Sequence, residues 1–474
     1  MSSRGATLAV LNTVGLMIVL DSTIVAVAIP AIQQDLGFSP AGVAWVINGY
    51  LVAFGGLLLL AGRLGDLLGS RRVFLGGLAL FTLASLLCGF ATSAGLLVAG
   101  RFLQGAGGAF ASAVILGVIV RLYPDPGPQA RALGVFSFTQ AGGAAIGFVV
   151  GGVLTDLAGW PAIFLINVPI GVAAFVAGLR LLPAVPPVAG GLDVPGALLI
   201  TAGLSAGVYA IVDGVAPAGA AALLLLAAFL VRQKHARSPL IPLRLLRRPW
   251  LLAANGAVLL IVAAGLGFQF VNTLFLQRVL GFDAMRTGLA FLPTPVMIGL
   301  VSLLLAARLT ARFGPRRVLL GGLVLAAGGL IALSRLPESP SYLLGVLPAL
   351  TVMGLGLGAA LPAIMMLSMA GASEEDTGLV SGLNNTAQQA GMALGLSVLA
   401  AASAGRAAAS SARGAGEVAA LQDGYGLAFL LAAGFVAAAS LVALTFLRRP
   451  PAPASRTLTP SGAQPREDHR EGTP

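Results

Sequence analysis

The sequence predicts an all-α integral membrane protein, and composition, the length of its apolar segments and the placement of its basic residues carry that prediction. Of 474 residues, 57% are hydrophobic and only 9% are charged, and the mean hydropathy is +0.95. A soluble domain typically carries about 25% charged residues. Helices in lipid satisfy their own backbone hydrogen bonds and need much less charge. The composition therefore excludes a soluble globular domain.

Apolar stretches of about 20 residues, bounded by charges or by Pro and Gly clusters, are typical of transmembrane helices. The first stretch is longer than a secretory signal core of roughly 7 to 15 residues, so we expect it to remain uncleaved. Fourteen helices are predicted, at 8–30, 42–62, 73–91, 95–120, 131–154, 161–182, 195–212, 217–231, 250–277, 287–307, 318–336, 341–369, 378–402 and 426–447.

The basic residues indicate how the chain crosses the membrane. The net charge is +11, which alone is compatible with a nucleic-acid partner, but the basic side chains lie in short loops between apolar runs. That placement is typical of the positive-inside rule and argues against nucleic-acid binding. We expect a multi-pass protein of the cell (plasma or inner) membrane with both termini cytoplasmic. The outer loops then hold only Arg278, Arg286, Arg335, Arg406 and Arg413.

An internal repeat indicates two related halves. Residues 63–80 read RLGDLLGSRRVFLGGLAL and residues 308–325 read RLTARFGPRRVLLGGLVL. Eight predicted spans separate the two copies, and this even number gives both the same orientation. We therefore predict two parallel six-helix bundles with two helices inserted between them.

The domain boundaries follow from these segments. The N-terminal bundle is predicted at 1–182, the linker with inserted helices 7 and 8 at 183–249, and the C-terminal bundle at 250–447. Residues 448–474 are Pro-rich and polar, and we expect a disordered cytoplasmic tail. The basic connector at 232–249 is either a topology determinant or a contact for anionic lipid headgroups.

Five motifs occur in order along the first six predicted spans. They are LDSTIVAVAIP at 20–30, GRLGDLLGSRR at 62–72, RFLQG at 101–105, GAAIGFVVGG at 143–152, and Trp160 followed by IFLINVPIG at 163–171. Together they resemble the fourteen-span drug/proton antiporter branch of the major facilitator superfamily. The chain departs from the branch at Ala26, where Asn is usual, at Phe148, where Pro is usual, and at Pro161, where Arg is usual.

The resemblance implies a secondary transporter that exports small amphipathic compounds, such as drugs or antibiotics, in exchange for protons by alternating access. It also implies a conformational latch in the loop after the second span, formed by Gly62, Asp66, Gly69, Arg71 and Arg72. The alternative for this loop is a solvated topology determinant. The second copy of the repeat has Ala at the position of Asp66, so an acidic latch would exist only in the N-terminal half.

Asp21 is the only acid that the sequence places deep in a span. A carboxylate at mid-helix costs about 2.5 to 3.5 kcal/mol on insertion scales, so such residues are usually functional. Burial penalises the anion, which would let Asp21 load and release protons, whereas a nearby cation would oppose that effect. Arg101, in the fourth span, is the candidate cation. Asp21 and Arg101 are therefore predicted to couple transport to protons or, alternatively, to form a purely structural ion pair.

Small residues follow one face of the fifth predicted span. Gln140, Gly143, Gly147 and Gly151 recur at helical spacing, and Gly152 completes the motif. This spacing predicts a groove for close helix approach. The resemblance to antiporters implies that the groove also seals the pathway against leak and supports rocking of the halves.

Polar side chains inside other apolar spans are candidates for the substrate cavity. Interhelical hydrogen bonding is the rival interpretation. A cavity of amides without a second carboxylate favours neutral or singly charged amphipathic compounds and predicts weak handling of dications. The candidates are Asn48, Tyr50, Gln104, Gln269, Asn272, Asn384 and Gln388.

Other chemistries lack the required residues. His235 and His469 lie in a loop and the tail, Cys88 is the only cysteine, and no phosphate-binding loop motif is present. We therefore predict that the protein is not an enzyme and has no metal site and no cofactor. We expect a monomer that uses the proton gradient. Its expected partners are an amphipathic small molecule, protons and the lipid bilayer. The alternatives are an uptake or facilitative carrier of a specific metabolite and a transport-inactive membrane sensor or scaffold.

Overall fold

The computed structural model describes residues 3–183, 191–236, 239–240, 248–337, 340–369 and 377–447. These residues are helical and contain no strand, which confirms the predicted all-α class. The predicted tail at 448–474 lies outside the described residues, as do residues 237–238 and 241–247 of the basic connector at 232–249.

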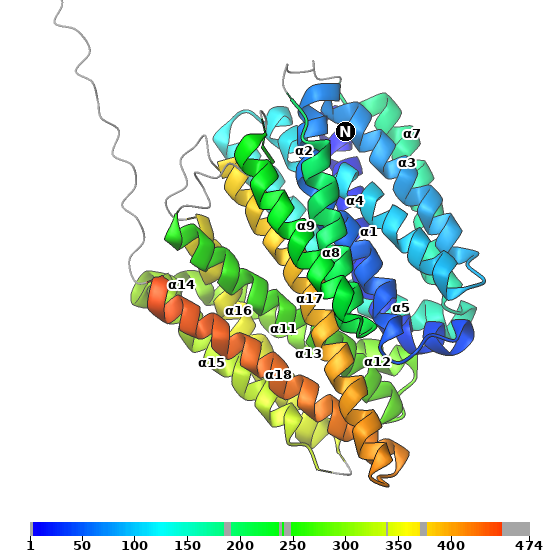
Figure 1. Ribbon diagram of the computed structural model, residues 1–474. Coiled ribbons are helices and arrows are strands. Elements are labelled where there is room, and N and C mark those ends of the chain that lie inside the picture. Colours follow the sequence, from blue (N-terminus) through cyan, green and yellow to red (C-terminus); the bar gives the residue numbers. More distant parts are fainter. Residues whose placement is uncertain are drawn as a thin grey trace, which may run out of the picture.

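The first part of the chain forms a group of helices that pack on one another (Figure 1). Within it, α4 packs on α2 and α3, α1 packs on α5, and α7 packs on α3 and α1. The helices are α1 (Ser3–Leu36), α2 (Trp45–Leu68), α3 (Ser70–Gly89), α4 (Ala94–Leu122), α5 (Pro126–Ala158), α6 (Pro161–Leu165) and α7 (Asn167–Leu181), with a 3-10 turn at Gly42–Ala44 before α2.

The last part of the chain forms a second group. Here α11 packs on α17 and α18, α15 packs on α16 and α18, and α13 packs on α16. The helices are α11 (Pro249–Arg278), α12 (Ala284–Phe291), α13 (Pro293–Leu304), α14 (Ala306–Phe313), α15 (Pro315–Ser334), α16 (Leu347–Met369), α17 (Thr377–Ala412) and α18 (Glu417–Phe446), with a π-helical turn at Tyr342–Val346 before α16.

Two helices lie between these groups in the sequence, α8 (Val194–Val212) and α9 (Ala216–His235). They pack on each other, and α8 also contacts α2 and α17. Asp193, the residue before α8, links the start of α8 to the end of α9. Its carboxylate accepts hydrogen bonds from Arg232 Nε at 3.0 Å and Gln233 Nε2 at 2.7 Å. The same buried carboxylate accepts from the backbone N–H of Gly196 and caps α8. The sequence interpretation overlooked this acid because it stands in a Pro- and Gly-rich segment.

Two predicted spans are broken helices rather than continuous ones. The sixth, predicted at 161–182, divides into α6 and α7 because Pro169 has no N–H to donate to Leu165. The tenth, predicted at 287–307, divides into α12, α13 and α14, and Pro295 likewise cannot bond to Phe291, the last residue of α12.

The internal repeat has the same local structure in both copies. Gly69 and Gly314 separate consecutive helices with φ of +91° and +80°, a region that favours glycine. Arg71 then donates to the carbonyl of Leu179 near the end of α7, and Arg316 donates to the carbonyl of Leu444 near the end of α18. Each guanidinium thus satisfies carbonyls that have no partner within their own helix.

The two groups contact each other near the end of the molecule where α1 and α5 finish. Gln277 Nε2 donates to Val27 O at 3.0 Å, and Arg278 Nη2 donates to Gln33 Oε1 at 2.5 Å. The carboxylate of Asp156, in α5, accepts from the backbone N–H of Met285 at 2.8 Å. A second contact joins α2 and α17, where Asn48 Nδ2 donates to Ser397 Oγ at 2.8 Å.

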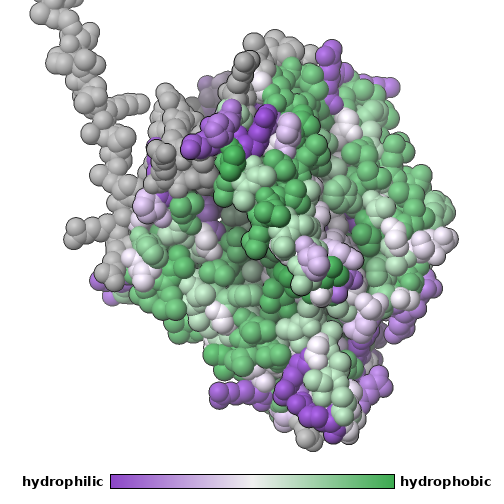
Figure 2. Space-filling model, in the orientation of Figure 1, coloured by the Kyte–Doolittle hydropathy of each residue, from purple (hydrophilic) through white to green (hydrophobic). Residues whose placement is uncertain are grey.

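The surface agrees with a lipid environment. Figure 2 shows hydrophobic residues over the sides of the helices and hydrophilic residues mainly toward the two ends of the molecule. Leu223, Leu303 and Leu344 are more than two-thirds exposed, at 72%, 76% and 86%. Among the described residues, 13 helices are long and apolar enough to cross a membrane. The helix α5, with 33 residues, is not among these 13 helices, and several of its side chains lie outside the described residues. The count of fourteen spans and the two-bundle layout stay predictions.

Candidate functional site

Asp21 lies at the centre of a buried polar cluster between α1, α2, α3, α4 and α7. Its side chain is fully buried. Its Oδ2 pairs with Arg101 Nη1 at 2.5 Å, and its Oδ1 accepts from Gln104 Nε2 at 2.7 Å and from Asn167 Nδ2 at 2.9 Å. The carboxylate therefore has a charged partner and two amide donors in a site closed to solvent.

Arg101 keeps several partners besides Asp21. Its Nε donates to Val46 O at 2.8 Å and its Nη1 to Gln104 Oε1 at 2.6 Å. The guanidinium also lies over the ring of Tyr50, with Cζ at 4.6 Å from the ring centroid, and at 5.6 Å from that of Phe164. Aromatic faces attract such a cation. The pairing of Asp21 with the predicted cation is therefore present.

Gln104 is the hub of the cluster, since its amide donates to Ser85 Oγ at 2.8 Å as well as to Asp21. Gln104 and Tyr50, which the sequence predicts for the substrate cavity, both contact Arg101 in the Asp21 cluster; their place in a substrate cavity stays a prediction. A buried guanidinium needs several partners. Gln104 supplies a hydrogen-bond acceptor to Arg101, and Tyr50 supplies an aromatic face. Asn167 and Ser85 were not among the predicted site residues. The signal for Asn167 was an amide flanked by apolar residues in the motif at 163–171.

The glycine face of α5 packs directly on α1. A side chain at Gly147 would overlap Thr23 Oγ1, and one at Gly151 would come within 2.8 Å of Ile24 O. Gly143 faces Leu16 in the same way. This arrangement is the close approach that the small-residue spacing predicts. Because Thr23 and Ile24 follow Asp21 on α1, the contact lies beside the buried cluster.

The remaining residues of the antiporter motif lie at the ends of this contact. Gln140 lies against Gly15 of α1, and Gly152 turns away from α1 to contact Ala284 and Met285 at the start of α12. The helix α5 therefore touches both groups of helices.

Arg71 of the predicted latch contacts a neighbouring helix, whereas Asp66 faces Arg63 of its own helix. The Asp66 carboxylate lies 3.8 Å from Arg63 of the same helix, and both side chains are exposed. Arg63 also reaches Gly191 O at 3.2 Å, and Arg71 reaches the end of α7. Gly62 lies within α2 and Arg72 is exposed on α3. The expected engagement of Asp66 with a neighbouring helix end is therefore not among the contacts of the described residues in this conformer.

The other predicted cavity residues lie in four different environments. Asn48 makes the interhelical bond to Ser397, which is the rival interpretation of its polarity. Asn384 accepts from Gln388 Nε2 at 2.6 Å along α17. Asn272 is fully buried, and neither of its side-chain polar atoms has a partner among the described residues.

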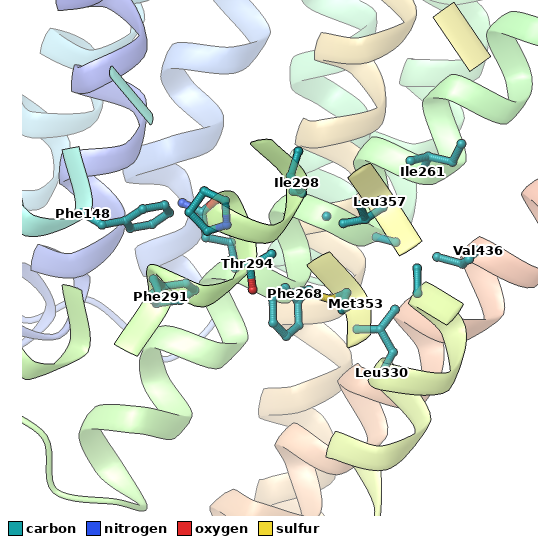
Figure 3. Close-up of a pocket in the computed structure, with 15 residues that line it drawn as sticks. Phe148, Ile261, Phe268, Phe291, Thr294, Ile298, Leu330, Met353, Leu357 and Val436 are labelled. Carbon is teal, nitrogen blue, oxygen red and sulfur yellow. The ribbon is translucent and has the colours of Figure 1, made fainter. Parts of the chain in front are cut away.

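Gln269 lines an apolar pocket of about 210 Å³ (Figure 3). Most of its wall comes from α11, α13, α15, α16 and α18, and α5 contributes Phe148. Phe148 stacks on Phe291 of α12, with ring centroids 4.8 Å apart and planes 7° from parallel. The sequence did not predict this pocket, because its apolar lining has no polar signal except Gln269 and Thr294.

Comparison with known proteins places the chain in a family. The model of the Major Facilitator Superfamily matches residues 11–396. The puromycin resistance protein pur8 of Streptomyces alboniger is 37% identical over 92% of this chain and 90% of its own length. The cephamycin export protein CmcT of Amycolatopsis lactamdurans is 36% identical over 82% of each chain. The tetracenomycin C resistance and export protein of Streptomyces glaucescens is 35% identical over 81% of this chain and 73% of its own.

Solved structures show the same fold at much lower sequence identity. A bacterial homologue of the human lysosomal transporter Spinster, in an inward-facing and occupied conformation, has a TM-score of 0.70, 17% identity and coverage of 94% of this chain and 97% of its own. The sequence resemblance is thus confirmed: the chain is a multi-pass membrane protein that belongs to the Major Facilitator Superfamily, and its relatives include antibiotic export and resistance proteins.

Proposed function

We propose that this protein exports small amphipathic compounds from the cytoplasm across the cell membrane in exchange for protons. The names of its relatives, which are antibiotic export and resistance proteins, support the direction of transport and the type of substrate. The observation that carries proton coupling is the fully buried pair of Asp21 and Arg101, with Gln104 as a shared partner. A buried ionisable pair at this depth is costly to maintain and usually functional.

The partners of Arg101 make a change of protonation at Asp21 feasible. Removing one member of a buried pair usually leaves an uncompensated charge. Here Val46 O, Gln104 Oε1 and the ring of Tyr50 continue to stabilise the guanidinium when Asp21 takes up a proton. Asp21 can therefore alternate between a paired carboxylate and a neutral acid while Arg101 keeps its other partners.

The packing of α1 on α5 offers a route from Asp21 to the substrate. Thr23 lies against Gly147, and the next residue, Phe148, lines the apolar pocket. Movement of α1 when the Asp21–Arg101 pair opens would therefore shift the Phe148 side chain. Because the glycines let α5 and α1 pack closely, a small displacement of α1 moves α5 as well.

Alternating access requires the contacts between the two groups of helices to break and reform. Under the predicted orientation, Gln33, Asp156 and Arg278 lie at the outer end. Their bonds would hold the outer end closed in this conformer. We infer two six-helix halves that rock about the Asn48–Ser397 contact, with α8 and α9 packed at one side.

The test measures ethidium-induced proton release from inverted vesicles that contain the wild-type protein, Asp21→Asn, Arg101→Ala or the matched control Asp35→Asn. Asp35 lies near the end of α1 and binds Trp160, outside the cluster. We expect release with the wild type and the control and a loss of at least tenfold with Asp21→Asn. Equal proton release in all four would rule out coupling through this pair. Ethidium flux without proton release would indicate a facilitative carrier, and no flux at all would indicate a sensor or scaffold.

A further inference from the structure

We propose that the pocket beside α5 binds a flat, uncharged aromatic part of the transported compound, and that Gln269 donates a hydrogen bond to a carbonyl oxygen on that part. Phe148 then acts as a specificity residue. The inference deepens the transport function proposed above, because it names the chemistry of the substrate portion that the protein recognises.

The size of the pocket suits part of a substrate rather than a whole one. Its volume is about 210 Å³. A dry apolar cavity of about 150 Å³ is known to bind benzene, whereas sites for whole drug-sized ligands occupy roughly 300 to 1,000 Å³. One or two fused rings therefore fit, and the rest of the molecule must extend beyond the pocket.

The wall next to α5 favours flat rings. Phe148 and Phe291 stack nearly in parallel, and Figure 3 shows both side chains at the same side of the pocket, with Phe268 farther along it. A planar ligand placed against this pair gains aromatic contacts that a puckered saturated ring lacks. Phe148 comes from the first group of helices and Phe291 from the second. The ligand would thus contact both groups of helices.

Gln269 supplies a hydrogen-bond donor. Its Nε2 is buried and has no partner among the described residues. The other polar side chain of the lining, Thr294, already donates to Leu350 O at 3.4 Å. A buried amide without a partner is costly, so an acceptor on the ligand restores a bond that the empty pocket lacks.

Charged groups do not fit this position. No acidic or basic side chain is among the described residues that line the pocket, and apart from Gln269 and Thr294 those residues are apolar. Transfer of an unpaired charge into such a site is strongly unfavourable. The recognised part of the substrate is therefore neutral, and any charge on the compound lies outside the pocket.

The test compares three ligands with the same framework of heavy atoms: 2-acetonaphthone, 2-isopropylnaphthalene, in which a methyl group replaces the carbonyl oxygen, and 2-acetyldecalin, which lacks the aromatic rings. Binding of tritiated 2-acetonaphthone to the purified protein in detergent is measured after subtraction of empty micelles, and the other two compete for it. We expect the wild type to prefer the ketone over the hydrocarbon by about fivefold, the contribution of one hydrogen bond.

Two variants separate the two interactions. Gln269→Leu should abolish the preference for the ketone over the hydrocarbon, and it leaves no amide without a partner, so the fold should be kept. Phe148→Leu should reduce the preference for 2-acetonaphthone over 2-acetyldecalin by about threefold or more. The control is Phe446→Leu, an exposed phenylalanine near the end of α18, which should bind like the wild type. Thermal unfolding of each variant checks folding.

The outcome is independent of proton coupling, because binding is measured without a gradient. The wild type should show the ketone preference in detergent even if its vesicles release no protons. A ketone preference that survives Gln269→Leu, or the absence of saturable binding to the wild type, would overturn the pocket assignment while leaving the transport proposal intact.

Discussion

Arg71 and Arg316 make equivalent contacts in the two copies of the internal repeat. Each stands just after a glycine with positive φ, and each donates to backbone carbonyls near the end of a later helix, α7 for Arg71 and α18 for Arg316. Cationic side chains at the C-terminal end of a helix interact favourably with its dipole and with its free carbonyls. The repeat therefore preserves a contact between helices as well as a sequence.

Arg71→Ala and Arg316→Ala should lower stability by similar amounts, about 1 kcal/mol each, because each removes bonds to carbonyls that then lack a partner. The neighbouring Arg72 and Arg317 are exposed and their alanine variants serve as controls. Unfolding midpoints in detergent measure the effect. A much larger loss for only one arginine would contradict the equivalence.

Arg101→Ala should destabilise the protein by about 3 to 5 kcal/mol, because it leaves the Asp21 carboxylate buried without its charged partner. The double variant Asp21→Leu/Arg101→Met should lose less than the single variants Asp21→Leu and Arg101→Met together, since it removes both charges. Denaturant unfolding of the four proteins completes the cycle. Strict additivity would show that the two side chains do not interact energetically.

Gly147→Ala should reduce transport by at least tenfold, because the added carbon overlaps Thr23 and separates α5 from α1. The matched control is Gly142→Ala in the same helix, where an added carbon meets nothing within 4 Å. Ethidium efflux from cells and the amount of folded protein are measured together. Normal efflux in Gly147→Ala would mean that the close approach of the two helices is dispensable.

Asp193→Ala should weaken the α8–α9 hairpin by about 1 to 3 kcal/mol, because the carboxylate accepts from Gly196, Arg232 and Gln233 and is buried. Asp125→Ala is the control, since Asp125 precedes α5 without making a side-chain cap. Hydrogen exchange of α8 and α9 reports the difference. Equal protection in both variants would argue against a structural role for Asp193.

Efflux should distinguish singly charged from doubly charged cations. Ethidium and propidium share a ring system but carry one and two positive charges. The apolar pocket has no acidic lining residue, and the buried Asp21 is already paired with Arg101. We expect ethidium efflux to exceed propidium efflux by at least tenfold. Comparable efflux of both would require an additional acidic group in the pathway.

The order of the amino acids alone predicts the helical membrane class, the family and the pairing of Asp21 with Arg101. Each depends on a local pattern: apolar length, motif spacing, or a charge in an apolar run. Such patterns persist in one dimension because lipid imposes the same requirement on every span. The small-residue face of α5 was predictable for the same reason.

The tertiary structure decided which side chains meet. Gln104 and Tyr50 contact Arg101, Asn48 bonds to Ser397, and Phe148 stacks on Phe291. No local sequence pattern predicts an apolar pocket, because the residues that line it cannot be distinguished in sequence from those that face lipid. Hydrogen-bond partners and aromatic contacts depend on packing between helices distant in sequence, and only the folded chain brings them together.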